Sequence, residues 1–218
     1  MFSLTEWRIE LIPPDEEGSR FYLDYYKPFR LAALEQDPDV FGSTHDREIN
    51  FSNDDWLSRI NNPLVKTFVA VRLHDRKVLS ATSLIGPMPN PDPASNPFQV
   101  SSEMKNGSDH HHQNHQNHGE ASSVRFQISG VYTLPDARRQ GLAKILAETA
   151  IQEAFAYSKQ HSKRLELSLV VYTSNGDAIS FYESCGFVAS AEGARKSFNP
   201  HKNASADEIC MHYQKSPE

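Results

Sequence analysis

The chain has 218 residues, of which 38% are hydrophobic, and its formal net charge at pH 7 is −6. This hydrophobic content supports a real core, and the negative charge argues against a nucleic-acid binder or a protein held on membranes by basic residues. No stretch reaches the ~20 apolar residues of a membrane span, and the opening residues MFSLTEWRIE do not resemble a signal peptide. We therefore expect a cytoplasmic, intracellular protein with a single domain over residues 1–218.

The first part of the chain predicts an α/β unit with an antiparallel element. WRIELI, residues 7–12, alternates as a strand does, and apolar residues recur at helical spacing from residue 20 to residue 35, where Pro28 must kink or divide the helix. Ser52 or Asn53 can cap a short helix that carries Trp56 and Ile60. Residues 67–86 contain two β-rich runs joined by HDRK, which predicts a hairpin.

Residues 87–123 lose all periodicity and are rich in proline, asparagine, serine and histidine. Such a segment buries too little apolar surface to offset its ordering entropy, so we predict a long loop inserted within the domain. Five of the ten histidines lie here, at positions 110, 111, 112, 115 and 118. Imidazoles in this number bind zinc, nickel or copper adventitiously, but a functional site also needs fixed geometry, so we expect no metal requirement.

The remainder predicts a strand–helix–strand–helix unit followed by two strands. The strands are expected at 124–134 and 164–172, and the helices carry apolar faces over 142–155 and 175–185. FVASA and EICMHYQ, residues 187–191 and 208–214, predict the final strands. The two cysteines, Cys185 and Cys210, fit no metal or disulfide spacing and are interpreted as reduced core residues.

The start of the predicted helix 142–155, in DARRQGLAKILAETA, places cations where a helix dipole favours acids. Two interpretations are open at this point. Exposed arginines at a helix start cost only a few tenths of a kcal/mol, so the pattern can be structurally neutral. Alternatively, free N–H groups, the dipole and Arg138 or Arg139 together bind a phosphate.

Two motifs here resemble those of the GNAT superfamily of acyl-CoA-dependent N-acetyltransferases. VYTLPDARRQGLAKIL is similar to the family's strand followed by an R/Q-x-x-G-x-G/A turn, and NGDAISFYESCGF is similar to its asparagine helix with a Tyr-x-x-x-Gly-Phe ending. Together the two motifs cover about residues 124–190, and DPDVFGSTHDREI gives a softer match. The resemblance implies an α/β (α+β) fold: a mixed central sheet with antiparallel N-terminal strands and a splayed parallel pair at the cofactor cleft, flanked by helices.

The resemblance also implies the contacts of the cosubstrate, acetyl-CoA. The backbone of Val131, Tyr132 and Thr133 should bond the pantetheine arm, and Asn175 should contact the cofactor nearby, although a plain helix cap is the alternative for Asn175. The diphosphate should lie at the turn, where Gly141 permits close backbone approach and Ala143 is small. The residues of that turn are Arg138, Arg139, Gln140, Gly141, Leu142, Ala143 and Lys144.

Acyl transfer to an amine needs an acid for the departing thiolate and a base for the amine. Tyr182 occupies the family's position for the acid, and its alternative role is a core aromatic. The family's usual glutamate is missing from the strand RFQISGVY, which offers Gln127. This departure leaves a water relay or a residue from elsewhere as the base. Glu48 and Glu166 are candidates that the sequence does not rank, and for both we favour a solvated surface carboxylate.

The function expected from these residues is transfer of the acetyl group of acetyl-CoA to a primary amine of a small molecule or peptide. A catalytically silent CoA-binding or metal-responsive module is the alternative. The partners expected are acetyl-CoA and an amine acceptor, without nucleic acid or membrane. The sequence names neither the acceptor nor the oligomeric state, and a homodimer is compatible with it.

Overall fold

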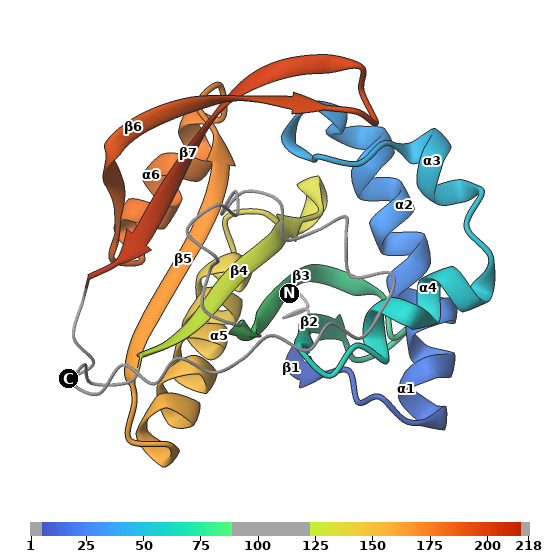
Figure 1. Ribbon diagram of the computed structural model, residues 1–218. Helices are drawn as coiled ribbons and strands as arrows, with labels where there is room; N and C mark the ends of the chain where they lie inside the picture. Colours follow the sequence, from blue (N-terminus) through green and yellow to red (C-terminus); the bar gives the residue numbers. More distant parts are fainter. Residues whose placement is uncertain (1–5, 89–122, 215–218) are drawn as a thin grey trace, which may run out of the picture.

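The computed structural model describes residues 6–88 and 123–214 (Figure 1). The described strands form a seven-stranded sheet in the order β1-β2-β3-β4-β5-β7-β6, in which only β4 and β5 pair in parallel. The predicted mixed sheet is confirmed. The predicted loop at about 87–123, with its histidines, lies outside the described residues except at its ends. The strands are β1 Trp7–Leu11, β2 Val65–Arg72, β3 Val78–Met88, β4 Ser123–Thr133, β5 Arg164–Tyr172, β6 Phe187–Asn199 and β7 Ala204–Tyr213.

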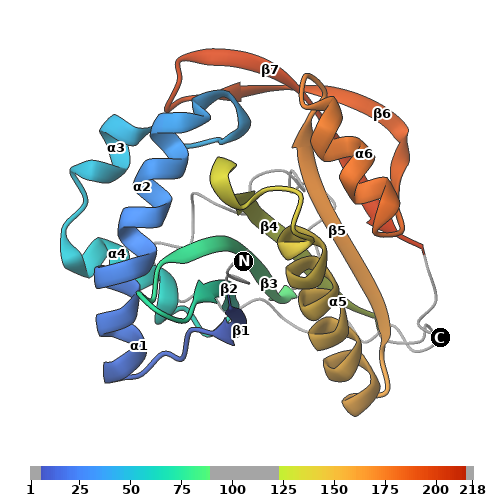
Figure 2. The same ribbon diagram turned by 180° about the vertical axis from the view of Figure 1, so that it is seen from behind.

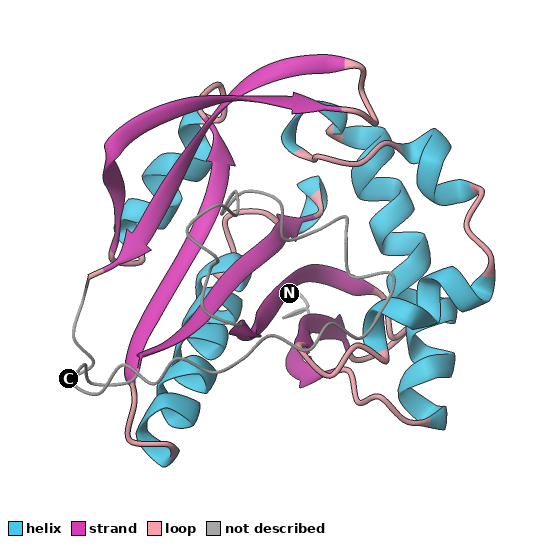
Figure 3. Cartoon of the chain, viewed as in Figure 1, coloured by secondary structure: helices cyan, strands magenta, loops and turns pink. Residues whose placement is uncertain are grey.

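Helices lie on both faces of the sheet, and each face has its own core. Figure 2 shows α5 and α6 on one face, and α1 and α2 stand at the side of the other (Figure 3). Strand β2 sends Phe68 and Ala70 into the core under α5, and Val69 and Val71 into the core of α1–α4, because side chains alternate along a strand. The helices are α1 Glu16–Phe21, α2 Lys27–Gln36, α3 His45–Ile49, α4 Asn53–Ile60, α5 Leu142–Gln160 and α6 Gly176–Ser184.

The first predicted helix is divided, as Pro28 required. A π-helical turn, Tyr22–Tyr26, separates α1 from α2, and the Lys27 N–H bonds to the Tyr22 carbonyl. Since Pro28 has no N–H, the wider turn just before it accommodates the missing bond. The helix also begins earlier than predicted, because the Asp15 side chain accepts a hydrogen bond from the Gly18 N–H and caps α1.

Capping residues and small apolar residues determine where the other helices begin and how they pack. Ser52 caps α4 in a reciprocal capping box with Asp55, which decides between the two predicted caps. The alanine-rich face of α5 allows the helix to pack closely on β3, β4 and β5, and it buries Leu146, Ala147 and Ala150 completely. Helix α3, capped by Thr44, was not foreseen.

The C-terminal hairpin is much longer than predicted. Strands β6 and β7 extend over residues 192–207, a stretch whose exposed, polar side chains carry little hydrophobic alternation. The hairpin arches over the upper end of β5 toward α2 and α3 (Figure 1). Cys185 is buried as expected, but Cys210 is only half-buried, so its assignment to the core was wrong. No helix in the described ranges is long and apolar enough to cross a membrane.

Candidate active site

The parallel strands β4 and β5 separate partway along their length. Their ladder ends at the pair Gln127 and Ser168, and from Ser168 onward β5 pairs with β7 on its other side. In β4 the register against β3 shifts between Ser129 and Tyr132, where Gly130 has a φ of +65°. This β-bulge re-aims the end of β4, so that a gap opens between the two strands.

The gap exposes unpaired backbone groups on β4. The Leu134 N–H donates to the Leu79 carbonyl, so the backbone groups of Leu134 point toward β3. Those of Tyr132, two residues earlier, point the same way, and the Tyr132 carbonyl accepts a hydrogen bond from the Ser80 hydroxyl. Because backbone groups alternate sides along a strand, those of Val131 and Thr133 face the gap. The Tyr132 ring lies in the helical core against Phe29 and Phe41. The predicted backbone contacts thus divide: the backbone groups of Val131 and the N–H of Thr133 face the gap, the Thr133 carbonyl accepts a bond from Arg138, and Tyr132 pairs with β3.

The turn after β4 ends in a helix N-terminus with free donors. Helix α5 begins at Leu142, and the Ile145 N–H is the one that bonds to the Gly141 carbonyl, so the N–H groups of Leu142, Ala143 and Lys144 have no partner within the helix. Gly141 has a φ of +81°, and a Cβ built on it would meet nothing within 4 Å. The turn therefore requires glycine for its conformation, and it faces open space.

The cations of this turn have different surroundings. The Arg138 side chain turns away from the helix start: Nη2 donates to Asp37 Oδ2 at 2.5 Å, and Nε donates to the Thr133 carbonyl at 3.1 Å. The Tyr132 hydroxyl donates to the same Asp37 oxygen at 2.6 Å, and burial together with this bond raises the pKa of Tyr132 to about 12. Lys144 lies 4.0 Å from Glu148, and Arg139 makes no ion pair with any described residue. Arg139 and Lys144 therefore remain for an anion, while Arg138 positions the end of β4.

Helix α6 places the other two predicted residues. Asn175 Oδ1 accepts a hydrogen bond from the Ala178 N–H, so Asn175 caps the helix, and its amide group also lines a cavity. Tyr182 is 9% exposed, and its ring packs edge-on against Phe187. Its hydroxyl bonds to no described residue, and burial raises the pKa of Tyr182 far above its ordinary value. Tyr182 therefore stays protonated, as either predicted role allows.

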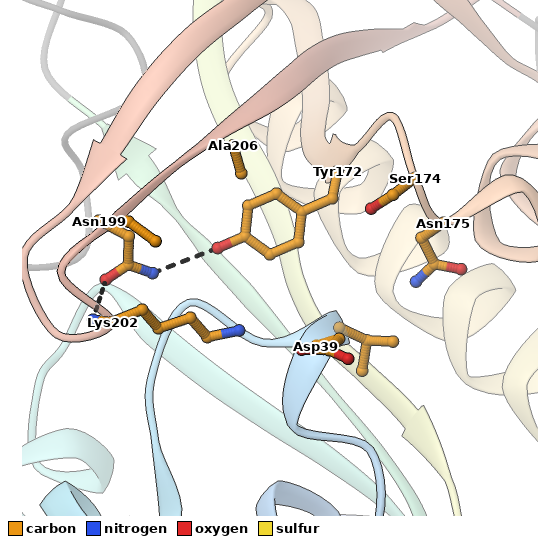
Figure 4. A pocket seen from close by; sticks show the side chains of 9 residues that line it. Asp39, Tyr172, Ser174, Asn175, Asn199, Lys202 and Ala206 are labelled. Carbon is orange, nitrogen blue, oxygen red and sulfur yellow. Dashed lines mark hydrogen bonds between the residues drawn. The ribbon is translucent and has the colours of Figure 1, made fainter.

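A cavity of about 490 Å³ lies between the end of β5, the β6–β7 hairpin and the segment joining α2 to α3, residues 37–44 (Figure 4). Asn199 Nδ2 donates to the Gly42 carbonyl at 2.8 Å and to the Tyr172 hydroxyl at 3.3 Å, and Lys202 Nζ donates to the Pro38 carbonyl at 2.7 Å. These bonds tie the hairpin to the 37–44 segment. The cavity is lined by Asp39, Val40, Tyr172, Ser174, Asn175, Asn199, Lys202, Ala204 and Ala206.

Comparison with known proteins agrees with this geometry. Residues 110–187 match the model of the acetyltransferase (GNAT) family, which spans the open strand, the helix start and α6. Over residues 110–187 the chain is thus similar to GNAT acetyltransferases. Comparison with curated protein sequences gives no significant match.

Solved structures share the GNAT fold along nearly the whole chain. NAA60 of Arabidopsis thaliana in complex with acetyl-CoA is 16% identical, covers 95% of this chain and 98% of its own, and gives a TM-score of 0.56. The ribosomal-protein-S5-alanine acetyltransferase of Vibrio fischeri is 14% identical over 97% of this chain and 94% of its own, with a TM-score of 0.59. The putative acetyltransferase yncA of Salmonella typhimurium with acetyl-CoA is 13% identical over 98% of both chains, with a TM-score of 0.60. At these identities the likeness concerns the fold.

The structure corrects the expectation for Glu48. This side chain is 1% exposed and lies between two arginines: Arg30 donates to both carboxylate oxygens at 3.1 and 3.2 Å, and Arg59 donates at 3.0 Å. Although burial alone would raise it, the two guanidinium groups lower the pKa of Glu48 to about 2. Glu48 is therefore a permanently charged structural residue of this GNAT fold. Glu166, by contrast, is a partly exposed partner of Arg164 at 2.7 Å.

Sequence reasoning did not identify the residues that surround the cavity. Asp37 meets Arg138 across 101 positions, and Asn199 meets Gly42 across 157, so no local pattern could pair them. The one available signal was the resemblance of DPDVFGSTHDREI to the family, from which only Glu48 was given a candidate role. No group of three or more His, Cys, Asp or Glu side chains in the described part of the chain could hold a metal ion.

Proposed function

We propose that the protein transfers the acetyl group of acetyl-CoA to a primary amine of a small molecule or peptide. The observation that supports this most strongly is the continuity of two features. The open backbone edge of β4 leads directly into a helix start with free N–H groups, at the glycine turn of Gly141. A ligand with an amide-containing arm and a diphosphate matches both features in that order.

The residues that would hold acetyl-CoA follow from this match. The pantetheine amides would pair with the open edge at Val131 and Thr133, and the Nδ2 amide of Asn175 would contact the same arm. The diphosphate would accept bonds from backbone N–H groups at the turn, and Arg139 and Lys144 would add charge. Two of the solved structures with this fold contain acetyl-CoA, which supports the assignment.

The chemistry requires one proton to leave the amine and one to reach sulfur. The free amine nitrogen attacks the thioester carbonyl, the carbon–nitrogen bond forms and the carbon–sulfur bond breaks. We propose that Tyr182 donates its proton to the departing thiolate, since its burial keeps the phenol protonated. The acceptor would enter through the cavity at Tyr172, where Asp39 and Lys202 supply opposite charges.

Acetyl-CoA binding provides the first test. Saturation at a hundred times the dissociation constant should stabilise the fold by about 2.7 kcal/mol, measured as a rise in melting temperature. Gly141→Val should abolish this rise, because the side chain would crowd the diphosphate. Gly193→Val is the matched control, since Gly193 also has a positive φ, +74°, but lies in the hairpin.

Turnover over a panel of polyamines, amino acids, aminoglycosides and peptide amino termini then separates an enzyme from a silent binding module. Release of CoA with any of these amines would support the transferase. Binding of acetyl-CoA without turnover of any amine would favour the silent module. A melting temperature unmoved by millimolar acetyl-CoA would contradict both.

A further inference from the structure

The open face of the β5–β7–β6 sheet carries a carboxylate beside the cavity. Ile209 and Met211 of β7 pack into the core under α5 and α6, so Glu208, between Ala206 and Cys210, turns to the opposite face. In register, Glu208 lies directly opposite Tyr172 on β5. Tyr172 and Ala206 both line the cavity, so Glu208 neighbours two lining residues on the same face of the sheet, although it does not itself line the cavity.

The surroundings of Glu208 leave its carboxylate able to exchange a proton. The side chain is half-buried, and burial raises the pKa of Glu208, while a hydrogen bond with Ser197 opposes this rise. Tyr172 faces it from β5 and Arg195 lies opposite it on β6, while Cys210 and then His212 follow on the same face of β7. Proximity to Glu208 in turn contributes to raising the pKa of Tyr172. Glu48 shows the contrasting case, in which two cations hold the charge fixed.

The reaction lacks a base at the expected place. On this face of the gap, β4 and β5 present Gln127, Ser168 and Val170, none of which accepts a proton at neutral pH. Glu166 lies on the same face before the strands separate, where it pairs with Arg164. Glu208 lies on the β7 side of Tyr172, and the gap opens on its β4 side. An acceptor amine held at Tyr172 would therefore have Glu208 as a neighbouring carboxylate. A carboxylate of raised pKa at this point is suited to take a proton from an ammonium ion.

We propose that Glu208 is the proton acceptor of the transfer, directly or through one water molecule. This inference rests on the proposed function. The ammonium ion of the acceptor gives one proton to the Glu208 carboxylate, and the resulting amine attacks the thioester. After the carbon–nitrogen bond has formed, the nitrogen releases its second proton to solvent and the thiolate receives a proton from Tyr182. Glu208 then returns its proton to solvent, and Tyr182 takes one back from solvent, which restores both residues.

The test compares Glu208→Gln with Asp207→Asn, which removes the neighbouring carboxylate on the exposed, opposite face of β7. Glu208→Gln should lower kcat/KM about 10²-fold near neutral pH, and Asp207→Asn should leave it unchanged. Both should keep the full rise in melting temperature with acetyl-CoA. If Glu208→Gln fails to fold, Glu208→Asp, which keeps the charge and shifts the carboxyl, should show a partial loss.

The pH profile gives a readout that a structural role would not change. In the wild type, kcat/KM should level off once the pH exceeds the pKa of Glu208, because the carboxylate deprotonates the ammonium ion. In Glu208→Gln the rate should instead keep rising, about tenfold per pH unit, up to the pKa of the acceptor amine. Unchanged profiles, with acetyl-CoA still bound and turned over, would overturn this inference alone. A wild type that neither binds nor uses acetyl-CoA would overturn the proposed function and this inference together.

Discussion

Glu48 and Glu208 are both carboxylates that are at least half-buried, but the charges around them differ. Glu48 belongs to the helical region, formed by α1–α4, and Glu208 belongs to the cleft region, which comprises the gap between β4 and β5 and the cavity beside Tyr172. In the helical region, Glu48 is fully buried between Arg30 and Arg59, and the pKa of its carboxyl falls to about 2. In the cleft region, burial raises the pKa of Glu208, as it does for Tyr172 and Tyr182. Pairing with cations fixes a charge and serves the fold, whereas burial without such pairing leaves groups that hold or exchange protons.

The largest expected effect on catalysis is at Tyr182, in the cleft region. Tyr182→Phe keeps the ring and its packing against Phe187 but removes the hydroxyl, so the thiolate would leave unprotonated. We expect kcat to fall roughly 10²–10⁴-fold, or about 3–5.5 kcal/mol of barrier, with acetyl-CoA affinity unchanged. Steady-state kinetics with the acceptor found in the amine panel would measure this loss.

Tyr213→Phe is the control, because Tyr213 packs against Phe187 in the same core. It should retain wild-type kcat. If Tyr182→Phe keeps more than half of wild-type kcat in an assay limited by chemistry, Tyr182 belongs to the core and not to the mechanism. Burial in the cleft region would then not by itself indicate a catalytic proton donor.

In the helical region, we expect a substitution to lower the stability of the fold and to leave catalysis unchanged. Glu48→Gln leaves two partly buried guanidinium groups without their counter-charge, which costs about 3–5 kcal/mol and lowers the melting temperature by on the order of 10 °C. Asp46→Asn, on the same helix but exposed, should cost almost nothing. Where Glu48→Gln remains folded, its kcat should equal that of the wild type. A large fall in kcat would instead place Glu48 in the chemistry.

The low pKa of Glu48 also predicts that the fold loses stability at acidic pH. Since the pKa of Glu48 in the fold, about 2, lies below its ordinary value of 4.5, its contribution is complete above about pH 5 and is lost as the pH falls toward 2. The loss should amount to about 3 kcal/mol. Chemical denaturation of wild type and Glu48→Gln between pH 7 and pH 3 should show the difference between them shrinking.

The smallest effect should come from the contact that joins the two regions. Asp37→Asn weakens the bonds from Arg138 and Tyr132, and the ion pair is partly exposed, so we expect about 1 kcal/mol or less. Because Pro38 and Asp39 follow directly, the acceptor KM should rise by up to about fivefold while kcat changes little. Asp136→Asn, at the exposed start of the same turn, is the control. An unchanged acceptor KM would mean that the 37–44 segment holds its place without Asp37.

Prediction from sequence succeeded where information is local. The strand β4, the turn at Gly141 and the helix of Tyr182 follow one another within a short stretch, and each carries its own periodicity and turn signals. The prediction for Glu48 was wrong, because the segment HDREI does not indicate which arginines the fold brings to its acidic residue. The hairpin from residue 192 to residue 207 was missed because its side chains face solvent, so its pairing is set by backbone bonds to a partner strand.

The position of β7 has a consequence for biosynthesis. This strand lies between β5 and β6, so neither β6 nor the outer side of β5 finds its partner until residues 204–213 have been synthesised. At roughly 5–20 residues per second, the inner sheet and the helices α1–α5 can form on the ribosome while β6 still waits unpaired. The bonds from Lys202 to Pro38 and from Asn199 to Gly42 should therefore be among the last to form. A nascent chain arrested before residue 204 should expose β6 to chaperones and show no acetyl transfer.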